Sequence, residues 1–131
     1  MGKKQKSKER LTILLATSDN YLKDKLLSVL SDKDFPVEVV NTCKEVFETL
    51  VDYNFDVVIF DPEIGKLEEL DAVQLIKKIR PKTPIIVVSD ETSYETGVKI
   101  AEMGVYFRMG KPINEKITKE LMKNVEKKLR K

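Results

Sequence analysis

The 131-residue chain contains no histidine and a single cysteine, and both shortages limit its chemistry. Without histidine there is no imidazole general base, no imidazole metal ligand and no phosphohistidine of the chain's own. Any catalysis therefore has to use carboxylates, hydroxyls, lysine or a bound metal ion. The one cysteine, Cys43, has no partner for an internal disulfide, which predicts a reducing, cytoplasmic location. We expect Cys43 to be a small packing residue and not a reactive thiol.

Long apolar runs and a strong charge of one sign are also missing. No run approaches the length of a membrane-spanning helix, and no apolar segment near the start resembles a signal peptide. Charged residues make up 35% of the chain, yet the formal net charge is only +2, so the surface lacks a strongly basic footprint. We therefore expect no membrane span and no direct binding to DNA.

The composition suits one domain preceded by a short arm. A chain of 131 residues with 41% hydrophobic residues is long enough to bury a core but too short for two ordinary domains. Residues 1–10 are polar and rich in lysine, and we expect a flexible arm whose charges serve solubility more than contact with an anionic partner. Residues 11–131 are the predicted folded domain.

Short apolar runs alternate with segments of helical periodicity along this domain. The runs that predict strands are residues 11–17, 37–40, 57–60, 84–89 and 105–108. Five strands that alternate with five helices predict an α/β fold, a doubly wound parallel sheet with helices on both faces. Two halves wound in opposite directions place the first and third strands side by side at the switch in strand order.

The helical segments carry local start and stop signals. Asp71 is the expected cap of the third helix, and residues 62–70 before it are expected to form a loop. In the fourth helix, the spacing of Tyr94, Val98 and Ala101 predicts the face toward the core, and Gly104 is the expected stop.

The third apolar run, residues 57–60, ends at Asp61 and Pro62. This pattern predicts a fully buried central strand with Asp61 at the point where the chain leaves the core. Ligand sites of open α/β sheets lie beyond the carboxyl ends of the strands, so Asp61 is the first candidate for chemistry. The alternative is that Asp61 only starts a turn, with Pro62 as the next turn residue.

Three other polar residues occupy comparable positions at strand ends: Asp19, Ser89 and Lys111. Two neighbouring carboxylates favour a cation, and Mg²⁺ needs only one or two carboxylates with waters and a phosphate. Lysine supplies a positive charge for a phosphoryl group, and serine supplies a hydroxyl donor. The set suits phosphoryl transfer to an aspartate. Each residue also has a plain alternative: Asp19 as a helix cap, Ser89 as a strand end and Lys111 as a loop lysine.

From about residue 11 to about residue 129, the sequence resembles the receiver domain of two-component response regulators. The family's phosphoacceptor matches Asp61, its hydroxyl residue after the fourth strand matches Ser89, and its Lys-Pro dipeptide begins at Lys111. Its acidic pair after the first strand matches Ser18 and Asp19, so only the second acid is present. The resemblance implies a flavodoxin-like receiver fold with strand order 2-1-3-4-5.

The resemblance also implies a function. Asp61 is expected to accept a phosphoryl group from a sensor histidine kinase or phosphotransfer protein, while Lys111 and Ser89 hold the product. Mg²⁺ is expected to bind weakly through Asp19, Asp61 and Glu63, because one acid of the usual pair is missing. Any enzymatic activity would be limited to phosphorylation and dephosphorylation of the chain's own aspartate. We expect a stand-alone receiver, without an effector domain after its last helix, that signals by contact with a downstream protein.

Several departures from the family pattern leave an alternative open. Pro62 directly follows the acceptor, and Asp90 stands where a small residue is usual, so that its charge opposes an incoming phosphate. Arg108 stands at the aromatic switch position and is expected to be exposed. A degenerate receiver that binds partners without phosphorylation is therefore the second hypothesis. An unrelated doubly wound domain for a small ligand is the third, although no glycine-rich phosphate loop follows the first strand.

Overall fold

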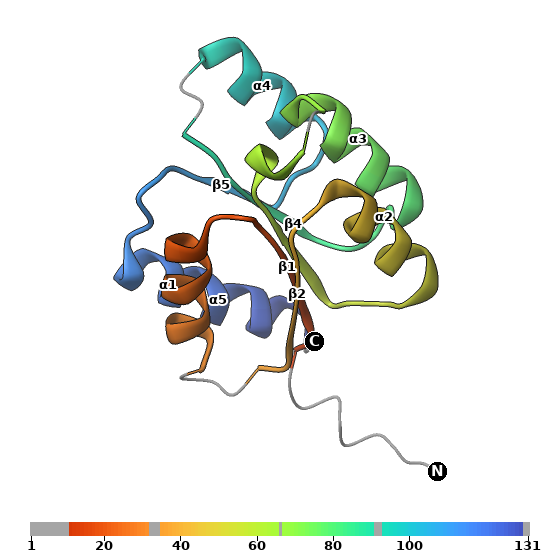
Figure 1. The fold of residues 1–131 in the computed structure, drawn as a ribbon. Coiled ribbons are helices and arrows are strands. Elements are labelled where there is room, and N and C mark those ends of the chain that lie inside the picture. The colour runs from red at the N-terminus through yellow and green to blue at the C-terminus, as the bar shows by residue number, and fades with distance from the viewer. Residues whose placement is uncertain (1–10, 32–34, 66, 91–92, 130–131) are drawn as a thin grey trace.

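Runs of branched and aromatic apolar residues form the strands of one parallel sheet in the computed structural model (Figure 1). The structure describes residues 11–31, 35–65, 67–90 and 93–129, so the expected basic arm, residues 1–10, lies outside the described residues. The strands are β1 (Ile13–Ala16), β2 (Val37–Val40), β3 (Val57–Phe60), β4 (Ile85–Val88) and β5 (Phe107–Met109). Their order, β2-β1-β3-β4-β5, confirms the predicted doubly wound receiver fold.

Helices cover both faces of this sheet. They are α1 (Asn20–Ser31), α2 (Cys43–Asp52), α3 (Glu69–Ile79), α4 (Tyr94–Glu102) and α5 (Glu115–Leu129), with a 3₁₀ turn, η3 (Pro62–Ile64), after β3. In Figure 1, α1 and α5 lie on one face, and α2, α3 and α4 lie on the other. No helix in the described parts of the chain is long and apolar enough to span a membrane.

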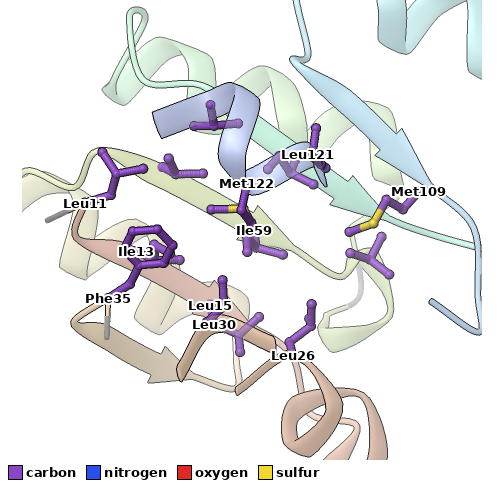
Figure 2. Packing of buried hydrophobic residues seen from close by; sticks show 14 of the residues in the cluster. Leu11, Ile13, Leu15, Leu26, Leu30, Phe35, Ile59, Met109, Leu121 and Met122 are labelled. Atoms are coloured by element: carbon purple, nitrogen blue, oxygen red, sulfur yellow. The ribbon is translucent and has the colours of Figure 1, made fainter. Parts of the chain in front are cut away.

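The sheet separates two hydrophobic cores because side chains alternate along each strand. Ile13 and Leu15 of β1 belong to the core under α1 and α5, whereas Leu14 and Ala16 belong to the core on the opposite face. Figure 2 shows the first core, with Met122 of α5 above the sheet. Each such buried aliphatic side chain stabilises the fold by roughly 1.5–3 kcal/mol.

The parallel register decides which residues meet at the carboxyl edge of the sheet. Ala16 pairs with Phe60, so the residues that follow, Thr17 and Asp61, leave the sheet side by side. The backbone N–H of Asp61 donates to the Ala16 carbonyl at 2.9 Å, which extends the pairing by one step. The ends of β1, β3, β4 and β5 therefore gather at one edge.

Two local predictions about the helices were wrong. Helix α3 begins at Glu69, so Asp71 lies in its first turn and does not cap it, and the N-cap residue, Glu68, makes no side-chain capping hydrogen bond. Helix α4 buries Ile100, whereas Tyr94 of the predicted inner face is 85% exposed. A short helix over the sheet edge leaves most of its surface in water, so its apolar spacing is a poor guide to the buried face. The predicted stop at Gly104 is confirmed by its φ of 83°.

Candidate functional site

Asp61 lies at the end of β3 with only 2% of its surface exposed, and both of its carboxylate oxygens accept hydrogen bonds. The Thr17 hydroxyl donates to Oδ2 at 2.7 Å. The Lys111 ammonium and the backbone N–H of Glu63 both donate to Oδ1, each at 3.0 Å. Burial removes water from a carboxylate at a large cost in free energy, and these three donors replace that water.

Thr17 is a residue of this site that the sequence reasoning missed. Its side chain is buried, and its hydroxyl oxygen also accepts from the backbone N–H of Asp19 at 3.1 Å. A signal was available, because Thr17 is the polar residue that ends the first predicted strand, and Asp61 directly follows the third. In parallel neighbouring strands, residues at equivalent positions leave the sheet together.

Lys111 connects Asp61 to a second carboxylate. Its Nζ atom lies 3.0 Å from Asp61 Oδ1 and 3.6 Å from Glu63 Oε1, and its side chain is 14% exposed. Burial works to lower the pKa of the Lys111 ammonium. The hydrogen bond and charge of Asp61, helped by the charges of Glu63 and Asp90, outweigh that effect, so the pKa is raised. Lys111 therefore remains a cation throughout the neutral range.

Asp19 lies at the start of α1 and lines the cavity beside Lys111. Its Oδ1 atom accepts from the backbone N–H groups of Tyr21 and Leu22 at 3.0 and 3.1 Å, so the carboxylate caps α1. Within the described ranges there is no cluster of three or more acidic, cysteine or histidine side chains that suits a metal ion. The three predicted metal ligands, Asp19, Asp61 and Glu63, do not form such a cluster in this structure, and their role in holding Mg²⁺ stays a prediction.

Ser89 lies at the end of β4, and its hydroxyl donates to Glu69 Oε1 at 3.1 Å. Glu69 is the first residue of α3, and its side chain is only 8% exposed. Arg108 of β5 donates to the same carboxylate twice, from Nε to Oε2 at 2.8 Å and from Nη2 to Oε1 at 3.2 Å. We call Glu69, Ser89 and Arg108 the Glu69 cluster.

The Glu69 cluster corrects the expectation that Arg108 is an exposed surface residue. The Arg108 side chain is 22% exposed and is held by a bidentate ion pair. Neither Glu69 nor its pairing was expected, because the sequence placed residue 69 in a loop. A carboxylate on the first turn of a helix suits the helix dipole, and that is a weak signal for its position.

Comparison with known proteins assigns this arrangement to a family. Residues 13–126 match the family described as the response regulator receiver domain. The chain belongs to the receiver domain family. In two-component signalling, a receiver domain implies a histidine kinase or phosphotransfer protein as its partner.

Relatives of this receiver domain include transcriptional regulators. The DNA-binding transcriptional regulator NtrC of Azospirillum brasilense is 32% identical over 118 residues, which are 90% of this chain and 24% of that protein. The chain thus spans about a quarter of the length of that relative.

Solved receiver structures share the fold. A CheY-like receiver domain protein from Methanospirillum hungatei JF-1 superposes with a TM-score of 0.82 at 23% identity, covering 91% of this chain and 95% of that chain. A two-component response regulator from Clostridium difficile gives a TM-score of 0.84 at 16% identity, covering 93% of this chain and 100% of that chain. At these identities, the likeness concerns the fold alone.

Receiver domains generally bind Mg²⁺ at an acidic pocket, and here the donor set is small. Asp61 and Glu63 both contact the Lys111 ammonium, so a single cation already bridges the two carboxylates. Two carboxylates meet the minimum that Mg²⁺ requires when waters and a phosphate complete its coordination. The residues present therefore fit a weak site at Asp61 and Glu63, without the third acid that was expected.

A cavity of 370 Å³ opens between the 3₁₀ turn η3 and the Glu69 cluster. Its lining includes the carboxylate residues Glu63, Glu68, Glu69 and Asp90, together with Ser89. Asp90 is exposed and also lines a second cavity of 520 Å³ beside Lys111. An anion that enters the first cavity therefore meets negative charge, and a bound cation would favour its binding.

Proposed function

We propose that this receiver domain accepts a phosphoryl group on Asp61 and then signals by contact with a downstream protein. The observation that carries the proposal is the contact between the buried Asp61 carboxylate and the Lys111 ammonium at 3.0 Å. A carboxylate nucleophile and a point positive charge are the two parts that transfer to an aspartate needs. The donor is a sensor histidine kinase or phosphotransfer protein, since this chain has no histidine of its own.

In the proposed transfer, an Asp61 carboxylate oxygen attacks the phosphorus atom of the partner's phosphohistidine. A phosphorus–oxygen bond forms, the phosphorus–nitrogen bond breaks, and its electron pair returns to the imidazole. Lys111 stabilises the negative charge on the transferred group. Thr17 and the Glu63 N–H hold the carboxylate in place for the attack.

Asp61 and Glu63 are the residues that would hold Mg²⁺. The bound ion supplies neutralisation of charge on the transferred group. With one acid of the usual pair missing, we expect dissociation in the millimolar range, about −4 kcal/mol of binding free energy. Lys111 then shares the neutralisation because it already contacts both carboxylates.

Intact mass spectrometry with acetyl phosphate, with and without Mg²⁺, tests the proposal. We expect a mass increase of one phosphoryl group that depends on Mg²⁺ and is lost in Asp61→Asn, because an amide is not a nucleophile here. Asp52→Asn, at an exposed site at the end of α2, is the matched control and keeps the increase. No increase, together with no effect of beryllofluoride on the spectrum of the folded protein, contradicts the proposal.

The second candidate is a degenerate receiver that binds its partner without phosphorylation. The negative lining of the cavity next to Asp61 and the capping role of Asp19 favour it. In both candidates we propose output through protein contact, without direct contact of these residues to DNA. DNA binding is named for the NtrC relative as a whole protein.

A further inference from the structure

The Ser89 hydroxyl has a single proton to donate, and the Glu69 carboxylate lies within hydrogen-bonding distance of it. The Ser89 Oγ to Glu69 Oε1 distance is 3.1 Å, and Ser89 is 7% exposed. A serine hydroxyl donates one hydrogen bond at a time. Ser89 therefore has to leave the Glu69 carboxylate before it donates to an oxygen of a phosphoryl group.

The Glu69 carboxylate is held in place by Arg108. The guanidinium donates from both Nε and Nη2, one bond to each carboxylate oxygen. This planar fork matches a carboxylate and fixes its orientation more strongly than a single ammonium contact. The Arg108 side chain also lies beside α4, because a methyl group at Gly97 would come within 3.8 Å of its Nη1 atom. Arg108 thus joins the start of α3 to α4.

We propose that Glu69 is a positioning residue that holds the Ser89 hydroxyl away from a phosphoryl group on Asp61. The inference rests on the proposed phosphorylation of Asp61. On phosphorylation, Ser89 exchanges its bond to Glu69 for a bond to a phosphoryl oxygen, while Arg108 keeps its two bonds to Glu69. Glu69 therefore opposes the phosphorylated state, and Arg108 keeps Glu69 oriented in both states.

Glu69→Gln tests this role with little change of shape. The amide keeps an acceptor oxygen but loses the charge that makes the bond to Ser89 strong, so the competition with a phosphoryl group weakens. We expect beryllofluoride to bind about tenfold more tightly and acetyl phosphate to label the chain about tenfold faster. A tenfold factor corresponds to the loss of about one charge-assisted hydrogen bond between Ser89 and Glu69. In the Ser89→Ala background, the same substitution should change both quantities by less than about twofold.

Glu68→Gln is the charge-matched control. Glu68 lines the same cavity one residue earlier and is exposed. Its substitution removes one negative charge but leaves the contact between Glu69 and Ser89. We therefore expect beryllofluoride affinity and labelling rate to change by less than about twofold. Arg108→Lys provides a second variant, since it keeps the cation but loses the fork. Arg108→Lys should increase beryllofluoride affinity and labelling rate by a smaller factor than Glu69→Gln. This increase should also disappear in the Ser89→Ala background.

Each outcome separates this inference from the proposed function. The positioning role is wrong if acetyl phosphate labels the natural chain but labels Glu69→Gln no faster. It is also wrong if Glu69→Gln speeds labelling by the same factor in the Ser89→Ala background. In both cases the phosphoacceptor role survives. An equal gain in Glu68→Gln shows a general effect of charge and also overturns the positioning role. If no variant takes a phosphoryl group or beryllofluoride, the proposed function fails and this inference fails with it. Amide spectra of every variant check that the fold is retained.

Discussion

Asp61 and Glu69 are two buried carboxylates at the same edge of the sheet, and they are paired in different ways. Asp61 receives a hydroxyl, a backbone N–H and one ammonium. Glu69 receives a hydroxyl and a bidentate guanidinium. An ammonium is a point charge on a flexible stem, so it follows a charge that moves, whereas a guanidinium fork favours one fixed arrangement. The difference suggests a reactive role for Asp61 and an orienting role for Glu69.

The two carboxylates are also positioned by different forces. The sheet register places Asp61 beside Thr17, because both residues continue a parallel pair of strands. Glu69 reaches its partners from a helix, through side-chain contacts to the ends of β4 and β5. Backbone pairing resists substitution of single side chains, whereas a cluster of side chains depends on each of its members.

Lys111→Met is expected to give the largest effect on the Asp61 side of this comparison. It leaves a buried carboxylate without its cation, and Asp61 is 2% exposed. We expect a loss of about 3 kcal/mol in the free energy of unfolding and about a hundredfold slower labelling by acetyl phosphate. Urea unfolding and timed mass spectrometry measure the two quantities.

Lys25→Met, which removes a surface ion pair to Glu115, is the control and should change both the unfolding free energy and the labelling rate very little. Similar losses in both variants would count against a special role for Lys111.

Thr17→Val is expected to have a smaller effect. Valine keeps the shape of threonine but removes the hydroxyl that donates to Asp61 at 2.7 Å. Asp61 then lacks one of its donors, which should cost about 1–2 kcal/mol of unfolding free energy. Thr17→Ser keeps the hydroxyl, so the loss measured by urea unfolding should be smaller in this variant. If serine costs as much as valine, the methyl group matters more than the hydrogen bond.

The pH dependence of the Lys111 contact should be the smallest effect in the neutral range. The pKa of Lys111 is raised in the folded protein, chiefly by Asp61 against the opposing effect of burial. A raised pKa stabilises the fold fully below the unfolded pKa of about 10.4, and the stabilisation is lost as the pH rises through the folded pKa. The difference in unfolding free energy between the natural chain and Lys111→Met should therefore be constant near neutral pH. A difference that already shrinks below about pH 9 would contradict this assignment.

The sequence by itself determined the layers of the fold and the edge where chemistry gathers. Short apolar runs of β-branched residues between turn signals, such as residues 57–60, favour a strand buried on both faces, and alternation with helices makes the sheet parallel. Asp61 lies at this edge because a polar residue directly after a buried strand has to lie where the strand leaves the core, and Lys111 reaches it from the loop after β5. These features depend on patterns within a few neighbouring residues.

Only the tertiary structure decided which side chains pair at that edge. Ser89 and Arg108 are separated from Glu69 by 20 and 39 residues, and their contacts depend on where the first turn of α3 lies over the sheet. That position follows from the packing of a whole helix face, which no local spacing specifies. The Asp19 carboxylate likewise has a partner that depends on where a helix begins, because it caps α1 through backbone N–H groups.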